Sequence, residues 1–103
     1  DFSRMVADLL VGAGLPEPLL EHQFWDDDGL IQMVDLAYPG VLAIGLDSLA
    51  HHLDRATFIG DRRARNRLEL LGVKVLLFTW WDYTEHPERL VAQVRAALAT
   101  TAA

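Results

Sequence analysis

The sequence contains no cysteine and no long apolar run, and both absences narrow the classes of protein to which it can belong. Without cysteine, disulfides, thiolate zinc sites and thiol nucleophiles are excluded. No stretch approaches the roughly 20 consecutive apolar residues that a membrane-spanning helix needs. We therefore expect a cytoplasmic domain without a membrane partner.

Basic residues are also scarce, with 9 Lys and Arg against 15 Asp and Glu and a net charge of −6. A chain of this charge has no overall attraction for the phosphates of nucleic acid. More than half of the basic residues nevertheless fall in one short segment, at Arg55, Arg62, Arg63, Arg65 and Arg67. A local phosphate-binding surface therefore stays compatible with the acidic composition.

The residues that are present have the composition of one globular domain. The chain has 103 residues, of which 51% are hydrophobic and 23% charged, and a chain of this length buries a single core. We therefore treat residues 1–103 as one domain. Because the sequence begins at Asp1 rather than methionine, we expect it to be the C-terminal part of a longer protein, with an N-terminal domain as its neighbour.

The spacing of apolar residues predicts the order helix, three strands, helix, strand, helix. The expected elements are a helix over 2–12, strands over 19–25, 30–37 and 41–47, a helix over 59–71, a strand over 73–80 with a lead-out segment, and a last helix from Pro87. Three meandering strands and a fourth that follows a helical crossover form a four-stranded mixed sheet flanked by helices. The predicted fold class is α/β (α+β).

The segment 34–52 organises this prediction. Two strand-forming runs flank Tyr38-Pro39-Gly40, in which proline restricts φ and glycine admits positive φ, so the segment is predicted to form an antiparallel hairpin. Each arm carries one aspartate in apolar surroundings, Asp35 in the first and Asp47 in the second. Since strand side chains alternate, both carboxylates are expected on one face of the hairpin.

An ordered series of short motifs runs along nearly the whole chain: Val34-Asp35-Leu36-Ala37-Tyr38-Pro39, Leu42-Ala43-Ile44-Gly45-Leu46-Asp47, His51-His52, Asp61-Arg62-Arg63, Asn66-Arg67-Leu68, Leu71-Gly72 and Phe78-Thr79-Trp80. As a set, it resembles the small endonuclease-like domains related to very-short-patch-repair (Vsr) nucleases, in the PD-(D/E)XK superfamily. The resemblance implies a core of helix, three strands, helix and strand. It also implies a place at the C-terminus of longer actinobacterial proteins, including AbiEi-type antitoxins.

The resemblance implies metal-dependent cleavage of phosphodiesters, in which carboxylates of the hairpin hold Mg²⁺. Asp35 matches the first acidic position of the family, and Asp47 is the aspartate of the second arm. His51 or His52 matches the histidine expected to act as a general acid and base. The implied metal ligands are therefore Asp35 and Asp47, and the implied catalytic residues are these two with His51 and His52.

The chain departs from the family at three acidic positions, which are occupied here by Gly45, Val6 and Arg65. If three residues close the hairpin turn, Asp35 lies opposite Ala43 and diagonal to position 45, whereas Asp47 lies roughly 13 Å of strand rise away. The carboxylate missing at position 45 would then be the nearer ligand. We expect a degraded metal site, with residual Mg²⁺ binding through one or two carboxylates and substrate phosphates left open.

Each candidate residue also has a structural interpretation. Asp35 would accept backbone hydrogen bonds within the sheet, and Asp47 would form an Asx turn as the chain leaves the hairpin. Trp80 and Trp81 could stack on a base or could pack at the rim of the core.

Three polar side chains face away from the predicted buried stripe of the arginine-rich helix, namely Arg62, Arg63 and Asn66. Such a face either grips nucleic-acid phosphates or is an ordinary solvated face paired with Asp61 and Glu69.

These observations favour a nuclease-fold domain with a degraded metal site that acts as a non-catalytic, nucleic-acid-associated or structural module. One alternative is a Mg²⁺-dependent DNA endonuclease. Another is a protein-interaction domain with no role in nucleic-acid binding, which the net charge of −6 favours.

Overall fold

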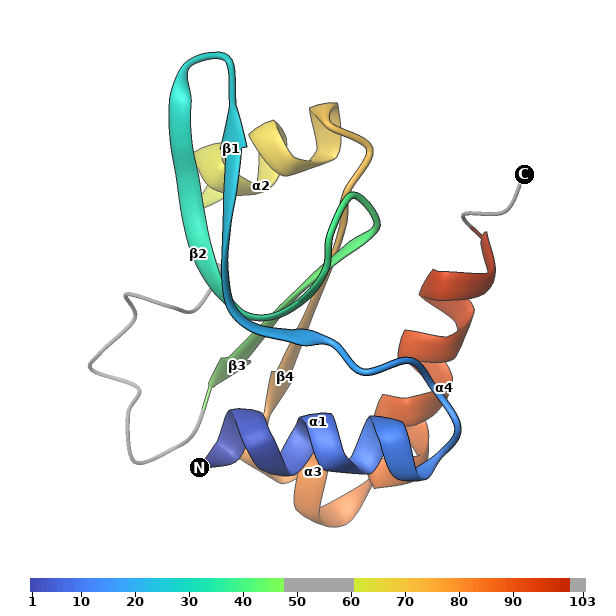
Figure 1. Cartoon of the computed structure of the whole chain (residues 1–103). Coiled ribbons are helices and arrows are strands. Elements are labelled where there is room, and N and C mark those ends of the chain that lie inside the picture. The colour runs from blue at the N-terminus through green and yellow to red at the C-terminus, as the bar shows by residue number, and fades with distance from the viewer. Residues whose placement is uncertain (48–60, 101–103) are drawn as a thin grey trace.

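Four strands form one mixed sheet, and helices pack on both of its faces (Figure 1). The structure is a computed structural model that describes residues 1–47 and 61–100. In chain order its elements are α1 (Phe2–Gly12), β1 (Leu19–Asp26), β2 (Gly29–Tyr38), β3 (Leu42–Asp47), α2 (Arg62–Leu70), β4 (Lys74–Thr79), α3 (Trp80–Glu85) and α4 (Pro87–Ala99). The predicted α+β class is confirmed.

The strands lie in the sheet in their sequence order, β1-β2-β3-β4. β1 pairs with β2 and β2 with β3 in antiparallel fashion, whereas β3 and β4 are parallel. A parallel pair requires a crossover connection, and α2 lies within it. The β1–β2 hairpin is long and extends beyond β3, with α2 beside its turn (Figure 1). The predicted four-stranded mixed sheet, with three meandering strands and a fourth after a helical crossover, is confirmed.

Helix ends follow local capping chemistry. The side chain of Asp1 accepts a hydrogen bond from the backbone N–H of Ser3 at 3.2 Å and caps α1. α1 ends before Gly14, whose φ of +89° suits glycine and turns the chain away. Within the described ranges, no helix combines the length and apolar content needed to cross a membrane.

The prediction that the segment after β4 is a simple lead-out is wrong, because residues 80–85 form the additional helix α3. Thr79 caps this helix by accepting a hydrogen bond from the backbone N–H of Asp82 at 3.2 Å. Asp82 accepts one in return from the backbone N–H of Thr79 at 2.8 Å. This reciprocal capping box ends the strand at Thr79 and places Trp80 in the helix.

The predicted register of the central hairpin is also wrong. Ala37, rather than Asp35, lies opposite Ala43. The reversal occurs over residues 39–41, and the N–H of Val41 donates to the carbonyl of Tyr38 at 2.9 Å. Tyr38 stays in β2 because its side chain is buried and its hydroxyl donates to the carbonyl of Pro16 at 2.8 Å. The whole second arm is therefore displaced by two residues from the predicted pairing.

Two buried clusters lie on opposite faces of the sheet. The larger one joins α1 and α4 to the sheet through Leu10, Leu36, Ile44, Phe78, Leu90, Val94 and neighbouring residues. The smaller one places α2 against the sheet through Phe24, Val34, Ala37, Ala43, Leu68 and Val73. Leu71, predicted to be part of the buried stripe of α2, is 45% exposed because the helix ends at Leu70.

Candidate functional site

Asp35 lies in β2, partly exposed, and its carboxylate reaches across to β3. Oδ2 of Asp35 accepts a hydrogen bond from the backbone N–H of Leu46 at 2.7 Å. Hydrogen bonds with an ionised acceptor are shorter and stronger than neutral ones, and this distance is typical of them. Asp35 therefore joins β2 to β3, and the structural interpretation, that this aspartate accepts backbone hydrogen bonds, is confirmed.

The register of the hairpin determines what faces Asp35. The observed pairs of β2 with β3 are Tyr38 with Leu42, Ala37 with Ala43 and Leu36 with Ile44. The next residues along the two strands are Asp35 and Gly45. Position 45, where the resemblance implies a second carboxylate, therefore directly follows the last observed pair of the hairpin.

Asp47 ends β3 and lies opposite Thr79 of β4. The predicted separation of roughly 13 Å of strand rise between Asp35 and Asp47 assumed that Asp35 lies opposite Ala43, and the structure pairs Ala43 with Ala37 instead. The Asx turn predicted after Asp47, and the two candidate histidines His51 and His52, lie outside the described residues.

A complete metal site would bring several acidic or imidazole side chains together. Within residues 1–47 and 61–100, no three His, Asp or Glu side chains come together as a group that could hold a metal ion. Of the residues assigned to Mg²⁺ by resemblance, the described part of the chain thus contributes the two aspartates, Asp35 and Asp47, at adjoining positions of the hairpin.

The arginine-rich helix presents the predicted faces. Asp61 caps α2 by accepting a hydrogen bond from the backbone N–H of Arg63 at 2.8 Å. Ala64 and Leu68 are buried against the sheet. The three candidate phosphate-binding side chains, Arg62, Arg63 and Asn66, are all exposed on the opposite side.

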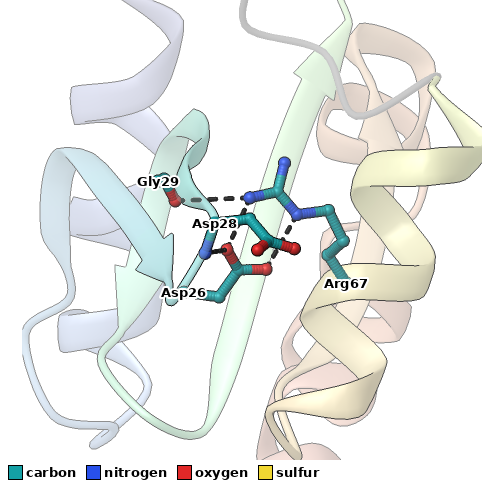
Figure 2. A network of polar contacts seen from close by, with 4 residues as sticks. All are labelled: Asp26, Asp28, Gly29 and Arg67. Atoms are coloured by element: carbon teal, nitrogen blue, oxygen red, sulfur yellow. Dashed lines mark hydrogen bonds and ion pairs between the residues drawn. The ribbon is translucent and has the colours of Figure 1, made fainter.

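A second polar arrangement was not predicted from the sequence, and Figure 2 shows it. Arg67 of α2 donates through Nε and Nη2 to the two carboxylate oxygens of Asp26, at 2.8 and 2.6 Å. Nη2 also donates to the carbonyl of Gly29 at 3.3 Å. In the acidic turn Asp26-Asp27-Asp28-Gly29, Asp27 and Asp28 are exposed, whereas Asp26 anchors the hairpin to α2.

This ion pair changes the protonation behaviour of both partners. The hydrogen bonds from Arg67 lower the pKa of Asp26, and the same contact raises the pKa of Arg67. The backbone N–H of Asp28 adds a hydrogen bond to Asp26 at 2.9 Å. Arg67 is consequently engaged within the protein, whereas Arg62 and Arg63 are exposed on the outer face of the helix.

The tryptophans that follow β4 pack as rim residues. The ring of Trp80 lies edge-on to that of Phe2, with centroids 5.2 Å apart. Trp81 is 54% exposed and contacts the imidazole of His86 at 4.6 Å. The core-and-rim interpretation therefore describes the contacts of both side chains.

Comparisons with other proteins were made against family models, curated proteins and solved structures. None of the three finds a match for this chain. The interpretation of the site consequently depends on the geometry of Asp35, Gly45 and Asp47 and on the exposed face of α2.

Proposed function

We propose that this chain is a cytoplasmic nuclease-like domain of the PD-(D/E)XK kind whose hairpin no longer completes a metal site. It acts as a non-catalytic module that associates with nucleic acid or with the rest of its own protein. The observation that carries this proposal is the environment of Asp35, whose carboxylate accepts a hydrogen bond at 2.7 Å from the N–H of Leu46, the residue that follows Gly45.

The charge around Asp35 supports the proposal. A divalent ion is attracted by the summed negative field of its ligands, and Mg²⁺ demands near-ideal octahedral geometry. With glycine at position 45, one carboxylate of the family pair is absent. The carboxylate that is present also has one oxygen directed at the main chain of β3, so rotating it toward an ion would leave the Leu46 N–H unsatisfied.

The outer face of α2 supports the association with nucleic acid. Arg62 and Asn66 are four residues apart and Arg63 and Asn66 three, so the side chains are neighbours on one helix surface. All three are exposed. Arginine and asparagine side chains donate hydrogen bonds to phosphate oxygens and position a protein on a nucleic acid without reading its sequence.

One observation favours a second candidate, a Mg²⁺-dependent DNA endonuclease. Extending the observed pair of Leu36 with Ile44 by one residue would place Asp47 diagonal to Asp35, where two carboxylates about 7–8 Å apart at the backbone could reach one ion. Two carboxylates with substrate phosphates satisfy the usual requirement of Mg²⁺. In this candidate Oδ2 of Asp35 keeps the Leu46 N–H and Oδ1 would be the oxygen that binds the ion.

Plasmid nicking with Mg²⁺ or Mn²⁺ separates the two candidates. The proposal expects no metal-stimulated nicking by the wild-type domain, whereas the endonuclease expects nicking that Asp35→Asn abolishes. Asp35→Asn is the appropriate variant because its amide oxygen still accepts the Leu46 N–H while the charge is removed. Nicking that depends on Asp35 would reject the non-catalytic assignment.

Restoring the missing carboxylate tests the geometry directly. Gly45→Glu should strengthen Mn²⁺ binding in calorimetry, because it places a second carboxylate across from Asp35. Gly45→Gln is the matched control, with the same size and no charge. Since Gly45 is buried, circular dichroism and urea unfolding should accompany both variants. Equal Mn²⁺ affinity in two folded variants would contradict the proposed register.

A salt series tests the nucleic-acid association. Combining Arg62→Ala with Arg63→Ala should reduce the slope of log affinity against log salt by about 0.9 for each duplex-DNA phosphate that the variant no longer neutralises. Removing Arg4 and Arg89, two exposed arginines of α1 and α4, gives a control of equal charge. Identical slopes for the two double variants would reject α2 as the phosphate-binding face.

A further inference from the structure

β1 forms one edge of the sheet, and its outer side has no strand neighbour within the described residues. Such an edge presents main-chain N–H and C=O groups outward, which makes it a template for another strand. A shallow hollow of about 460 Å³ runs along this strand and is lined by Leu19, Leu20, Glu21, His22, Gln23 and Trp25. The hollow therefore follows most of the length of this edge strand.

The edge carries few of the features that usually prevent strand addition. Proteins protect exposed edges with lysine or proline, and β1 contains neither. Leu19 and Trp25 are 50% and 58% exposed. Glu21, with a φ of +51°, distorts the strand, and the pairing of β1 with β2 shifts register between Phe24 and Trp25. The regular part between these two irregularities is His22 to Phe24, and Trp25 follows the second one.

The exposed charges on β1 and on the turn that follows it are acidic. The sequence has no Lys or Arg between Arg4 and Arg55, and Arg67, which reaches this end of β1 from α2, forms an ion pair with Asp26. Glu21 is exposed within the strand, and Asp27 and Asp28 are exposed at the turn that follows it. This surface repels phosphates, and it would also repel a second copy of β1, because facing strands would bring like charges together.

We propose that β1 binds an extended, basic segment of a partner protein as an added strand. The main chain of the segment pairs with the outer edge of β1 in the manner of β-augmentation. An apolar side chain packs on Trp25, and Lys or Arg side chains meet Glu21, Asp27 and Asp28. This interaction lies beyond the proposed function, since it uses neither the hairpin aspartates nor the outer face of α2.

The probe is an end-capped eight-residue peptide in which valine and lysine alternate. Its binding to the chain is measured by fluorescence anisotropy. It should bind saturably, whereas the valine–glutamate analogue should not. N-methylation of the lysine peptide at alternate residues removes main-chain donors and should weaken binding at least about tenfold. Trp25→Ala should weaken binding about tenfold, since buried aromatic contacts dominate most interfaces.

Trp81→Ala provides the matched control, because Trp81 is exposed to a similar extent, 54% against 58%, on a different element. The proposal requires that Trp81→Ala leave the affinity unchanged.

Absence of binding, equal affinity of the N-methylated peptide, or equal effects of the two tryptophan variants would each overturn it. A dimer of the free chain that Trp25→Ala disrupts would assign the edge to a second copy, and displacement of the peptide by duplex DNA would assign it to a polyanion. Either result would also overturn the proposal.

Discussion

The two faces of the sheet are held to their helices by different means. The face that carries α1 and α4 buries a broad set of large side chains, including Leu10, Leu36 and Leu90, each 0–1% exposed. The opposite face contacts the nine-residue helix α2, of which only Ala64 and Leu68 are buried. The difference shows that a short helix with a small apolar stripe needs another source of attachment.

The ion pair between Arg67 and Asp26 provides that attachment. It joins residues 41 positions apart and is bidentate, with donor–acceptor distances of 2.8 and 2.6 Å. A planar guanidinium facing a carboxylate also restricts orientation. The attachment of α1 and α4 to the sheet therefore depends on the shape and volume of buried side chains, whereas the attachment of α2 depends in part on charge.

The largest expected effect lies on the apolar face. Leu36→Ala should lower the free energy of unfolding by about 2–5 kcal/mol, because it removes a fully buried side chain and leaves a cavity. Urea unfolding followed by circular dichroism measures the loss. Leu19→Ala, at a position 50% exposed on the neighbouring strand, should change the same quantity by no more than about 0.5 kcal/mol. Similar losses for the two variants would contradict the assigned core.

The next largest effect is expected from the hydrogen bond between Asp35 of β2 and Leu46 of β3. Asp35→Ala should lower the free energy of unfolding by about 1–3 kcal/mol, since the Leu46 N–H loses its acceptor in a partly buried position. Hydrogen exchange should show faster exchange of the Leu46 amide in this variant. Asp35→Asn should restore most of its protection. An unchanged Leu46 exchange rate in Asp35→Ala would show that the hydrogen bond contributes nothing.

A smaller effect is expected from the hydrogen bond between the Tyr38 hydroxyl and the Pro16 carbonyl. Tyr38→Phe should lower the free energy of unfolding by about 0.5–1.5 kcal/mol, because the Pro16 carbonyl loses its donor. Burial raises the pKa of Tyr38 to about 12, against 10.0 for the free group. The neutral hydroxyl is thus favoured in the folded state, so its contribution is complete below pH 10 and is lost as the pH rises toward 12.

Unfolding measured across this alkaline range should therefore show a decline for the wild type that Tyr38→Phe lacks. A parallel decline of stability in both proteins would show that titratable groups other than Tyr38 cause it.

The smallest effect is expected on the α2 face. Asp26→Asn should lower stability at neutral pH, by less than the changes above because the pair is partly exposed, with 31% and 18% of its side chains accessible. The folded-state pKa of Asp26 is lowered from 3.8. The contribution of the carboxylate is therefore present above pH 3.8 and is lost as the pH falls through the lower folded-state value.

Urea unfolding of wild type and Asp26→Asn should consequently converge toward pH 2, and also in high salt, which screens exposed pairs. Asp27→Asn, at the exposed neighbouring position, is the control and should follow the wild type. A difference that persists at pH 2 would exclude the charge of Asp26 as its cause.

Much of the fold follows from local patterns in the sequence. The order of elements along the chain, the four-stranded mixed sheet, and the exposed face of Arg62, Arg63 and Asn66 all agree with predictions from spacing and turn residues. The extra helix α3 was missed although its capping box, from Thr79 to Asp82, is a local signal four residues long.

The register of the hairpin could not be derived in the same way. The turn residues alone allow either pairing, and the choice depends on the burial of Tyr38 and its hydrogen bond to Pro16, 22 residues away. The predicted pairing of Asp35 with Ala43 was therefore wrong, whereas the assignment of Asp35 and Asp47 to a site stays a prediction.

By itself the sequence determined the kinds of element, their order and the faces they bury, because capping, turn formation and apolar periodicity act over a few neighbouring residues. Only the tertiary structure decided which residue lies across from Asp35 and which arginine is engaged. Contacts such as Arg67 with Asp26 join distant segments, and they form only where packing of the whole sheet brings those segments together.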